Sequence, residues 1–403
     1  MRILILAQFF EPDITAAAFR LSDFTRLLAS QGHEVEVITA EPHKATVDVV
    51  DDSHFAELGV KIHRCKIKHL SDGGGSKAYI GHYLSFVRSG IAAGLKIWRS
   101  GWKPDVIYAS SPPLFIGLSG RFLSVLFRRP MVFEIRDIWP DAAVAAGQLS
   151  SSGWAYRIGR TLERYFYRKA KHLTCVSAPM KDYLNEQCQT PVTVVYNGVN
   201  LDSVSQPQVN TKEPSTHKEI LYAGNIGLLQ NLDVLVTAFH ELSQAGQIDG
   251  WKVRIIGAGA QREDVLELAD QYQNPAISIE PPVSRERVYQ ELRSADLLFL
   301  NLKSSETLAK SIPSKLFDYL LAARPILGGI EGEGQDILES TGANRCFRPG
   351  DQDDLKQQLL QMLGSFEQYE ANASQNLELV KQRFSREAAV QELVSVFERV
   401  TQR

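Results

Sequence analysis

Short hydrophobic runs alternate with longer helical patterns along the chain, and they form two series. Most runs of the first series are apolar on both faces, which is typical of strands buried between two layers of helices. This series predicts strands at Arg2–Phe9, Glu34–Thr39, Lys61–Ile67, Val106–Ser110, Met131–Ile135, His172–Val176 and Val192–Tyr196.

The segments between these runs have helical spacing. Within Ala16–Ser30, Leu21, Phe24 and Leu28 recur at intervals of three and four residues, and Gly32 follows as a C-terminal glycine. Strands and helices that alternate in this way predict a doubly wound parallel sheet with helices on both faces.

The second series follows a turn cluster at 196–200 and the stretch Ser203–Lys218, whose Ser, Pro, Gln and Thr content is typical of a linker or a surface excursion. It predicts strands at Ile220–Ala223, Lys252–Ile256, Ile277–Ile279, Leu297–Leu300 and Pro325–Leu327. We therefore expect an α/β protein of two Rossmann-like doubly wound domains that face each other across a cleft. Ligands of such folds bind beyond the carboxyl ends of the strands.

The expected domains are residues 1–199 and 200–383. A last helical pattern, Ser385–Val400, predicts a C-terminal helix within residues 384–403. This helix packs locally or crosses back to the first domain.

The composition, with 44% hydrophobic and 23% charged residues in 403, excludes disordered and fibrous classes. The cysteines Cys65, Cys175, Cys188 and Cys346 lack metal-ligand spacing, so neither a structural zinc site nor a disulfide framework is expected. No uncharged apolar stretch reaches the ~20 residues that span a bilayer. The first run meets Glu11 rather than a signal cleavage site. We expect a cytoplasmic protein, with peripheral contact on the inner face of the plasma membrane.

The net charge of −3 is an average over unlike halves, +6 for residues 1–200 and −9 for residues 201–403. The basic excess is concentrated in Lys61–Lys103 and Trp154–Lys171, where aromatic residues are interleaved with Lys and Arg. This pattern is typical of helices that touch an anionic membrane surface, although an ordinary amphipathic helix packed on the sheet explains it as well. The acidic second half and the lack of a nucleic-acid-binding signature argue against a nucleic-acid partner.

Several short motifs resemble those of a known family. In one-letter code they are FEPDITAAAFR (10–20), RDIWPD (136–141), YNGVN (196–200), YAGNIGLLQNL (222–232) and IPSKLFDYL (312–320). In this order they resemble retaining family 4 of the glycosyltransferases with GT-B fold. The resemblance covers nearly the whole chain. It is closest to the WbuB-like branch, which builds exopolysaccharide and O-antigen repeat units.

The resemblance implies an N-terminal acceptor-binding domain and a C-terminal domain that binds the donor, a nucleotide sugar with UDP as the expected nucleotide. It implies transfer to a saccharide or lipid-linked saccharide, with retention and without a metal or other cofactor. The sequence has no D-x-D motif for a divalent ion. Two alternatives stay open: a sugar-nucleotide epimerase of GT-B fold, and a non-catalytic membrane-associated scaffold.

A donor site must stabilise a leaving diphosphate, which helix N-termini and cations do well. Pro313, Ser314 and Lys315 are typical of a helix start: Pro313 suits the first turn, Ser314 can cap it, and Lys315 adds a charge. We expect phosphate binding here, although a plain capped core helix explains the same residues.

Relatives in the resembled family have two glutamates eight positions apart, for the donor sugar and the ribose. Lys310 stands at the first position and Asp318 at the second. Asp318 keeps a carboxylate that can accept hydrogen bonds from a ribose diol. Lys310 puts the usual sugar contact in doubt and places a second cation near the diphosphate.

Many relatives also carry Arg and Lys in the turn after the first strand of the second domain. Asn225 and Gln230 stand there, and they donate hydrogen bonds without charge. Our hypothesis is that the cations moved to the later helix. The candidates for balancing the leaving charge are Lys315, Lys310, Arg324 and Arg20.

Glycines also mark the expected donor site. Gly224 and Gly227 let the backbone approach phosphates, or form a plain tight turn. Gly257 opens a loop expected beside the nucleotide; Arg262 breaks its likeness to a dinucleotide fingerprint. Val283 ends a Pro-Pro-Val loop that is expected to meet the base.

On the acceptor side, Arg136 and Asp137 follow the strand Met131–Ile135, at the expected cleft mouth. Relatives have a His-Asp pair here, so the resemblance implies catalytic positions, with Asp137 orienting the acceptor hydroxyl and Arg136 binding donor or acceptor oxygens. A structural Arg–Asp ion pair explains them equally simply. Asp13 and Arg20 lie in and after the loop that follows the first strand, which is also expected to line the cleft.

Overall fold

The computed structural model describes residues 1–402 except 44–49, 69–75, 146, 148 and 202–216. The chain divides into two compact units, which are described separately. Unit 1 comprises Met1–Asn197 and Arg386–Arg403, and unit 2 comprises Gly198–Ser385. Most of the expected linker Ser203–Lys218 lies outside the described residues.

Unit 1 is built on a parallel sheet of seven strands in the order β3-β2-β1-β4-β5-β6-β7. The strands are β1 (Arg2–Leu6), β2 (Glu34–Ala40), β3 (Lys61–Cys65), β4 (Val106–Ser111), β5 (Met131–Ile135), β6 (His172–Cys175) and β7 (Val192–Val194). Alternate residues of β1 point into two cores, Ile3 and Ile5 into one and Leu4 and Leu6 into the other. Both faces of the sheet are therefore buried, as the apolar runs predicted.

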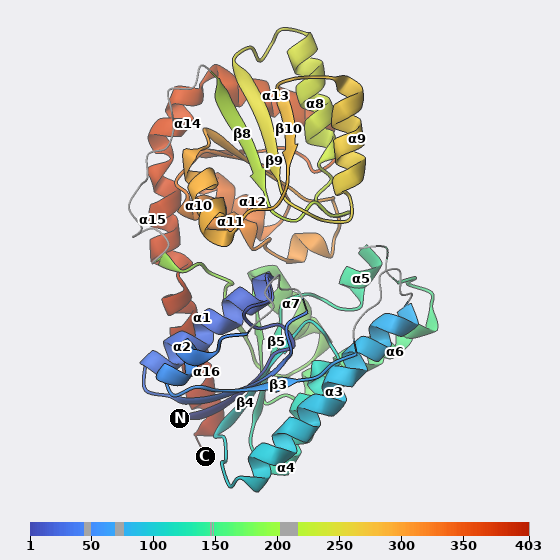
Figure 1. Cartoon of the computed structure of the whole chain (residues 1–403), viewed down its shortest axis with the longest axis vertical. Helices are drawn as coiled ribbons and strands as arrows, with labels where there is room; N and C mark the ends of the chain where they lie inside the picture. Colours follow the sequence, from blue (N-terminus) through green and yellow to red (C-terminus); the bar gives the residue numbers. More distant parts are fainter. Residues whose placement is uncertain (44–49, 69–75, 146, 148, 202–216, 403) are drawn as a thin grey trace. The chain divides into compact units, whose positions relative to one another are not determined.

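Helices cover the two faces of this sheet (Figure 1). One face carries α1 (Ala16–Ser30), α2 (Ser53–Glu57) and α16 (Arg386–Thr401); the other carries α3 (Ser76–Arg99), α4 (Ile116–Phe127), α6 (Trp154–Lys169) and α7 (Ala178–Gln187). A short helix, α5 (Asp141–Ala145), follows β5. The C-terminal helix α16 packs on α1, where Arg386 donates to Asp23 Oδ2 at 2.8 Å.

Unit 2 contains a second parallel sheet in the order β10-β9-β8-β11-β12-β13. Its strands are β8 (Lys218–Ala223), β9 (Trp251–Ile256), β10 (Ile277–Glu280), β11 (Leu297–Asn301), β12 (Ile326–Gly329) and β13 (Asn344–Cys346). The helices are α8 (Asp233–Gln244), α9 (Arg262–Tyr272), α10 (Arg285–Ser294), α11 (Lys315–Leu321), α12 (Glu333–Glu339), α13 (Gln352–Gly364), α14 (Phe366–Asn372) and α15 (Ser374–Arg383), with a 3₁₀ turn η2 (Leu308–Lys310) before α11. Residues of α8, α9 and α13 share one apolar core with the sheet.

The expected fold class is confirmed: two parallel-sheet α/β units with alternating strands and helices. Every predicted strand is present, although β1 ends at Leu6 rather than Phe9. Strand β13 was not predicted, because Asn344–Cys346 is short and lacks an apolar run. In the described part of the chain, no helix is both long enough and apolar enough to span a bilayer.

Candidate functional site

The predicted donor residues of unit 2 gather where the strand order reverses. This reversal lies between β8 and β11, which are hydrogen-bonded neighbours although β9 and β10 come between them in the sequence. Gly224, Asn225 and Gln230 follow β8, and α11 with Lys315 follows β11. Carboxyl ends of strands at such a switch point are the usual ligand site of open α/β sheets.

Lys315 reaches from α11 to the end of β8. Its Nζ lies 4.2 Å from the ring centroid of Tyr222, donates to the Tyr222 hydroxyl, and lies 3.4 Å from the carbonyl oxygen of Asn225. Its side chain also runs beside Gly224, where a Cβ would lie 2.1 Å from Cε of Lys315. The φ of Gly224 is 140°, a conformation that suits glycine. Gly224 therefore makes room for the lysine.

Burial against protein lowers the pKa of Lys315 to about 7, and the nearby Asp318 carboxylate offsets this only in part. An ammonium group that has lost much of its hydration is stabilised by any anion that reaches it. Lys315 is therefore suited to receive a phosphate charge.

The loop after β8 is held by its own side chains. Oε1 of Gln230 accepts from Asn225 Nδ2 at 3.1 Å and from the backbone N–H of Gly227 at 3.0 Å. Gln230 thus orders the turn that carries Asn225. The side chains of Asn225 and Gln230 bring no charge to this turn, as the sequence indicated.

Gly257 has a packing reason to be glycine. A Cβ on Gly257 would lie 1.8 Å from the carbonyl oxygen of Gly224, and the N–H of Gly224 donates to Ile256 at 2.8 Å. The loops after β8 and β9 are therefore in backbone contact. This contact accounts for Gly257 without a ligand.

Asp318 lies one turn after Lys315 on α11, and its Oδ1 accepts from the hydroxyl of Tyr289 at 2.7 Å. On the same helix, the hydroxyl of Tyr319 receives the N–H of Ala223 at 3.0 Å. These bonds tie α11 to α10 and to the end of β8, and they fix the side chains that flank Lys315.

Three residues expected at the donor site make other contacts than the sequence predicted. Lys310 pairs with Glu306 at 2.7 Å, so its charge is already partly balanced. Ser314 is the residue before α11, but its side chain makes no capping hydrogen bond, because its backbone is already helical (φ −58°, ψ −31°). Arg324 comes just before β12, at the amino ends of the strands, whereas Lys315 lies at their carboxyl ends. Arg324 donates to the carbonyl oxygen of Arg293 at 2.8 Å.

Val283 is exposed in the loop between β10 and α10. It lies on the same carboxyl edge of the sheet as Lys315, but β10 is separated from β8 by β9. The structure brings Lys315, Gly224, Asn225 and Gln230 together, and it leaves Val283 farther along the edge.

In unit 1, a buried carboxylate organises the expected acceptor side. Glu134 on β5 is 1% exposed, and its Oε1 accepts from Arg20 Nε at 3.0 Å and Nη2 at 2.9 Å. Arg20 also donates to the carbonyl oxygens of Val195 and Tyr196. Arg20 is fully buried, so the structure does not support the expected acceptor contact: this side chain joins α1 to β5 and to the end of the first domain.

Arg136 lies between this interior network and the surface. Its Nε is 3.8 Å from Oε2 of Glu134 and donates to the carbonyl oxygen of Ser111 at 3.3 Å. Burial alone would raise the pKa of Glu134, but Arg20 and Arg136 outweigh it and leave that pKa below its usual value. Glu134 is therefore an anion held by two cations.

Asp137 points the other way, toward solvent. It contributes to the wall of a pocket of about 180 Å³ that is otherwise mainly aromatic and apolar, with Tyr83, Pro113, Phe115 and Trp139. Partial desolvation by the surrounding chain raises the pKa of Asp137, and the charge of Arg136 opposes this rise. Because the residue is exposed to solvent, we expect an ionised carboxylate at neutral pH.

Asp13 is buried beneath the chain that follows β2. Its Oδ1 accepts from the backbone N–H of His43 at 2.9 Å, and its Oδ2 is 3.5 Å from His43 Nδ1. Asp13 is 1% exposed. Its carboxylate therefore holds the His43 segment in place. Across the residues that the structure describes, no three His, Cys, Asp or Glu side chains cluster closely enough to hold a metal ion.

Two family models match the chain over most of its length. A glycosyl transferase 4-like domain matches residues 15–198, and the model of glycosyl transferases group 1 matches residues 207–378. The chain belongs to the glycosyltransferases of GT-B fold.

Relatives and solved structures agree with this assignment. The putative colanic acid biosynthesis glycosyl transferase WcaI of Escherichia coli K12 is 25% identical over 288 residues, 67% of this chain and 69% of WcaI. HepE from Anabaena, solved with UDP and glucose, has a TM-score of 0.70 at 14% identity and covers 99% of this chain and 100% of its own. Sucrose-phosphate synthase from Thermosynechococcus elongatus has a TM-score of 0.76 at 14% identity, covering 99% and 98%. At these identities the structures show the fold alone.

Sequence reasoning about this glycosyltransferase missed three residues. Tyr222 and Tyr289 contact Lys315 and Asp318, and Glu134 is the anion that holds Arg20 and Arg136. Tyr222 lies in the motif YAGNIGLLQNL, two positions before Gly224, and could have been found there. Glu134 lies 114 residues from Arg20, and Tyr289 lies 29 residues from Asp318, so no local spacing indicated these two pairs.

Proposed function

We propose that this glycosyltransferase moves a sugar from a nucleoside diphosphate sugar, with UDP as the nucleotide, to a saccharide or lipid-linked saccharide. The reaction retains the anomeric configuration and uses no metal or other cofactor. The observation that carries the proposal is the cluster at the end of β8, where Lys315 lies on Tyr222 beside Gly224 with a pKa of about 7. HepE, which was solved with UDP and glucose, supports the choice of nucleotide.

Lys315 supplies the positive charge for the leaving diphosphate. The bond between the anomeric carbon and the phosphate oxygen breaks, and the acceptor oxygen forms the new bond on the same face of the sugar. The acceptor proton passes to the leaving phosphate oxygen. Negative charge grows on the diphosphate in this step, so a fixed cation there lowers the barrier.

The other donor residues have supporting roles in this proposal. Asn225 and Gln230 shape the phosphate loop, and Asp318 accepts hydrogen bonds from the ribose diol. Ser314 offers its hydroxyl to the diphosphate, and Val283 meets the base. Lys310 cannot replace the sugar contact of a glutamate, but it adds charge nearby when Glu306 releases it.

Unit 1 binds the acceptor. Asp137 orients the acceptor hydroxyl, and Arg136 binds donor or acceptor oxygens. We place the protein in cell-surface polysaccharide synthesis, in the WbuB-like branch that builds exopolysaccharide and O-antigen units. The likeness to WcaI, whose name refers to colanic acid biosynthesis, supports the placement in polysaccharide synthesis.

We also propose that the protein works in the cytoplasm, peripherally on the inner face of the plasma membrane. Support comes from α3, α4 and α6, which contact one another in sequence. Helices α3 and α4 contain no acidic residue, and the one acid of α6, Glu163, is fully buried and bonded to Arg160 and Tyr167. Anionic lipid attracts such a surface.

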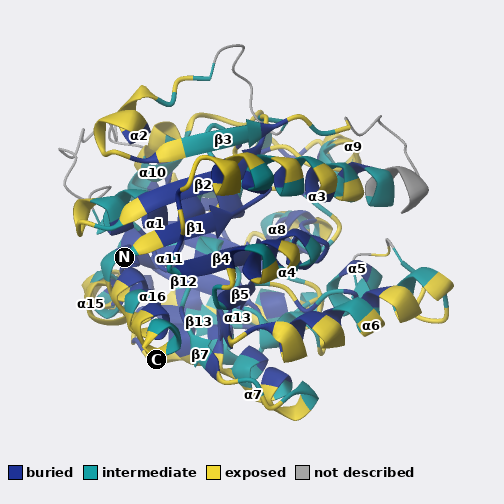
Figure 2. Ribbon diagram, turned by 90° about the horizontal axis from the view of Figure 1, so that it is seen from below, coloured by how far each residue is buried: buried dark blue, intermediate teal, exposed yellow. Residues whose placement is uncertain are grey.

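Large apolar side chains are exposed among the cations of these helices. They are Leu84 and Trp98 on α3, Phe122 and Val125 on α4, and Trp154, Ile158 and Tyr165 on α6. Figure 2 shows exposed positions recurring along α3 and α6. Residues 69–75 of the basic segment Lys61–Lys103 lie outside the described residues. Aromatic and cationic side chains on one face are typical of interfacial helices.

Calorimetry with UDP and a panel of UDP-sugars, followed by a transfer assay, tests the proposed function. We expect UDP to bind with a dependence on Lys315, and a UDP-sugar to be consumed only with an acceptor. Consumption without any acceptor, giving an isomerised sugar, would identify an epimerase. Absence of nucleotide binding would favour the alternative of a non-catalytic membrane-associated scaffold.

A further inference from the structure

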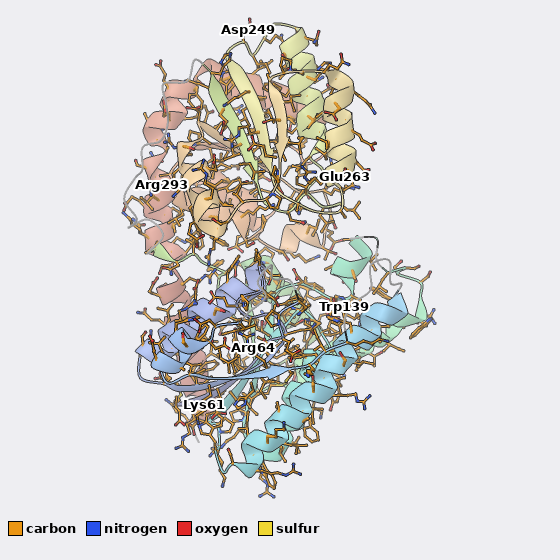
Figure 3. All side chains as sticks on the ribbon, viewed as in Figure 1. Lys61, Arg64, Trp139, Asp249, Glu263 and Arg293 are labelled. Atoms are coloured by element: carbon orange, nitrogen blue, oxygen red, sulfur yellow. The ribbon has the colours of Figure 1, made fainter. Side chains whose placement is uncertain are left out.

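Asn301 is the polar end of an otherwise apolar strand. It follows the four hydrophobic residues 297–300 and is the last residue of β11. In Figure 3, Asp249 marks the edge of unit 2 at which the strands begin, and Asn301 lies at the opposite edge, where the strands end. Asn301 is 0% exposed, so no ligand contacts it directly. Any effect of Asn301 on the reaction therefore passes through the residues that it contacts.

The amide nitrogen of Asn301 holds the loop that follows β8. Its Nδ2 donates to the carbonyl oxygen of Gln230 at 3.1 Å and to that of Asn231 at 3.1 Å. The amide must face this way, because its own oxygen in the same place would meet two other acceptors. A third bond between the same segments runs from the backbone N–H of Lys303 to the carbonyl oxygen of Leu229 at 2.8 Å. The end of β11 therefore binds three successive carbonyl groups of this loop.

The amide oxygen of Asn301 shows that packing alone does not require an asparagine here. Oδ1 is buried and has no hydrogen-bond partner in the part of the chain that the structure describes. An unpaired buried acceptor is unfavourable, and a leucine like those before it in β11 would avoid it. Gly329 of β12 leaves room for the amide, since a Cβ there would lie 2.2 Å from Oδ1. What the asparagine provides is its pair of N–H groups for the loop carbonyls.

The loop that Asn301 holds carries the residues next to Lys315. Oε1 of Gln230 accepts from Asn225 and from the N–H of Gly227, so the position of the Gln230 backbone sets where its side chain orders the turn. The carbonyl oxygen of Asn225 lies 3.4 Å from Nζ of Lys315. Asn301 is thus connected through Gln230 and Asn225 to the cation of the proposed donor site.

We propose that Asn301 is a positioning residue for the donor: by holding the carbonyl groups of Gln230 and Asn231, it fixes the loop 224–231 in the conformation that receives the diphosphate. The inference rests on the proposed function, since it concerns the donor site of the same enzyme. A loop that is already ordered loses less conformational entropy when a ligand binds. Without this hold, UDP should bind more weakly and the KM for the UDP-sugar should rise, whereas the KM for the acceptor should stay the same.

Calorimetry with UDP on the full-length protein tests this role. Asn301→Leu keeps the size of the side chain and removes both N–H groups, whereas Asn301→Ala removes the N–H groups and the volume. We expect both variants to weaken UDP binding about five- to tenfold, the effect of losing one or two hydrogen bonds that order the loop. Asn301→Ser keeps one hydroxyl donor and should lose about two- to threefold. If Asn301→Leu does not fold, this milder variant carries the same comparison.

Asn344 of β13 offers a matched control in the same unit. It is also a buried asparagine, and its Nδ2 donates to the carbonyl oxygen of Leu338 at 3.2 Å and to Oδ1 of Asn376 at 2.8 Å. Asn344→Leu should lower the urea midpoint of unfolding at least as much as Asn301→Leu does. UDP binding to the folded Asn344→Leu protein should change less than twofold, because β13 does not hold the loop after β8.

Two further measurements show whether Asn301 acts through the loop. Amide hydrogen exchange of residues 224–231, followed by mass spectrometry, should be about tenfold faster in Asn301→Leu, whereas β9 keeps its rate. In a Gln230→Ala background, Asn301→Leu should weaken UDP binding less than twofold further, because residues of one hydrogen-bond network are coupled. A residue that only stabilised the fold would give additive losses.

The outcomes separate this inference from the proposed function. Unchanged UDP binding in Asn301→Leu and Asn301→Ala overturns the positioning role alone, and so do additive losses in the double variant. An equal loss of UDP binding in Asn344→Leu also overturns it, because the effect would then follow stability. Faster exchange of residues 224–231 in Asn301→Leu, in a protein whose wild type binds neither UDP nor UDP-sugars, supports the hold on the loop and overturns the proposed donor.

Discussion

The side chain of Lys315 fills the space that a Cβ on Gly224 would occupy, with Cε only 2.1 Å from that position. The two residues are 91 positions apart, and they lie in the segments that follow the neighbouring strands β8 and β11. The position of the Lys315 cation and the conformation of the loop at Gly224 therefore depend on each other. The glycine leaves room for the end of the lysine side chain, and its φ of 140° makes any other residue at that position costly.

Gly224→Ala tests this dependence. The new methyl group would displace Lys315 and would strain a backbone with φ of 140°, at a cost of about 1–3 kcal/mol. We expect UDP binding, measured by calorimetry, to weaken about tenfold or more. Gly246→Ala is the control, because Gly246 also has a positive φ (66°) but no atom within 4 Å of its Cβ position. Equal losses of UDP binding in both variants would contradict the dependence.

Lys315 also predicts how UDP binding depends on pH. Burial lowers its pKa to about 7, so the empty site loses the positive charge as the pH rises through this value. Bound diphosphate stabilises the protonated lysine, so binding above pH 7 takes up a proton. The affinity for UDP should then fall between pH 7 and pH 9, approaching about tenfold per pH unit.

Calorimetry in buffers of different ionisation enthalpy measures this proton uptake. Lys315→Arg is the matched variant, because arginine stays charged throughout the range. Its affinity should vary little with pH. A pH profile shared by both proteins would show that another group is responsible.

Substitutions of Lys315 and Gln230 should lower the turnover rate by different amounts. Lys315→Ala removes the cation of the leaving diphosphate and should lower kcat by about 10²–10³, as the loss of one preorganised electrostatic contact does. Gln230→Ala removes only the bonds that order Asn225 and Gly227, so we expect a loss of about tenfold or less. Lys356→Ala, which removes a surface lysine of the same unit, controls for net charge. Near-normal turnover in Lys315→Ala would remove the proposed role.

The sequence predicted the strands well because most of them carry a run that is apolar on both faces, as in β1 with Arg2–Leu6. It also placed Gly224 and Lys315 at one site, because carboxyl ends of parallel strands share an edge. It could not indicate the pairing of Arg20 with Glu134, which are 114 residues apart. Spacing along the chain indicates local partners, whereas the partner of a buried charge is set by the order of strands in the sheet.

The buried pair of Arg20 and Glu134 predicts a stability defect. Arg20→Met would leave the carboxylate of Glu134 buried, with Arg136 as the neighbouring cation and the Ser110 hydroxyl as a donor, and removing one partner of a buried pair costs about 3–5 kcal/mol. We expect the free energy of unfolding, measured with urea, to fall by this amount. Arg26→Met is the control, since Arg26 is a partly exposed arginine of the same helix. A stable Arg20→Met protein with a raised acceptor KM would restore the acceptor role that its sequence position suggested.

The acid-free face of α3, α4 and α6 predicts lipid-dependent binding. We expect the protein to float with liposomes that contain anionic phosphatidylglycerol, to stay behind with phosphatidylcholine alone, and to be released by 0.5 M salt, because exposed charges are screened. Trp154→Ser combined with Ile158→Ser should reduce flotation several-fold, since both side chains are exposed on α6. Leu58→Ser removes an exposed apolar residue that follows α2, on the other side of the sheet, and should not reduce it. Flotation that is independent of lipid charge, or equally reduced by Leu58→Ser, would rule out this face as the membrane contact.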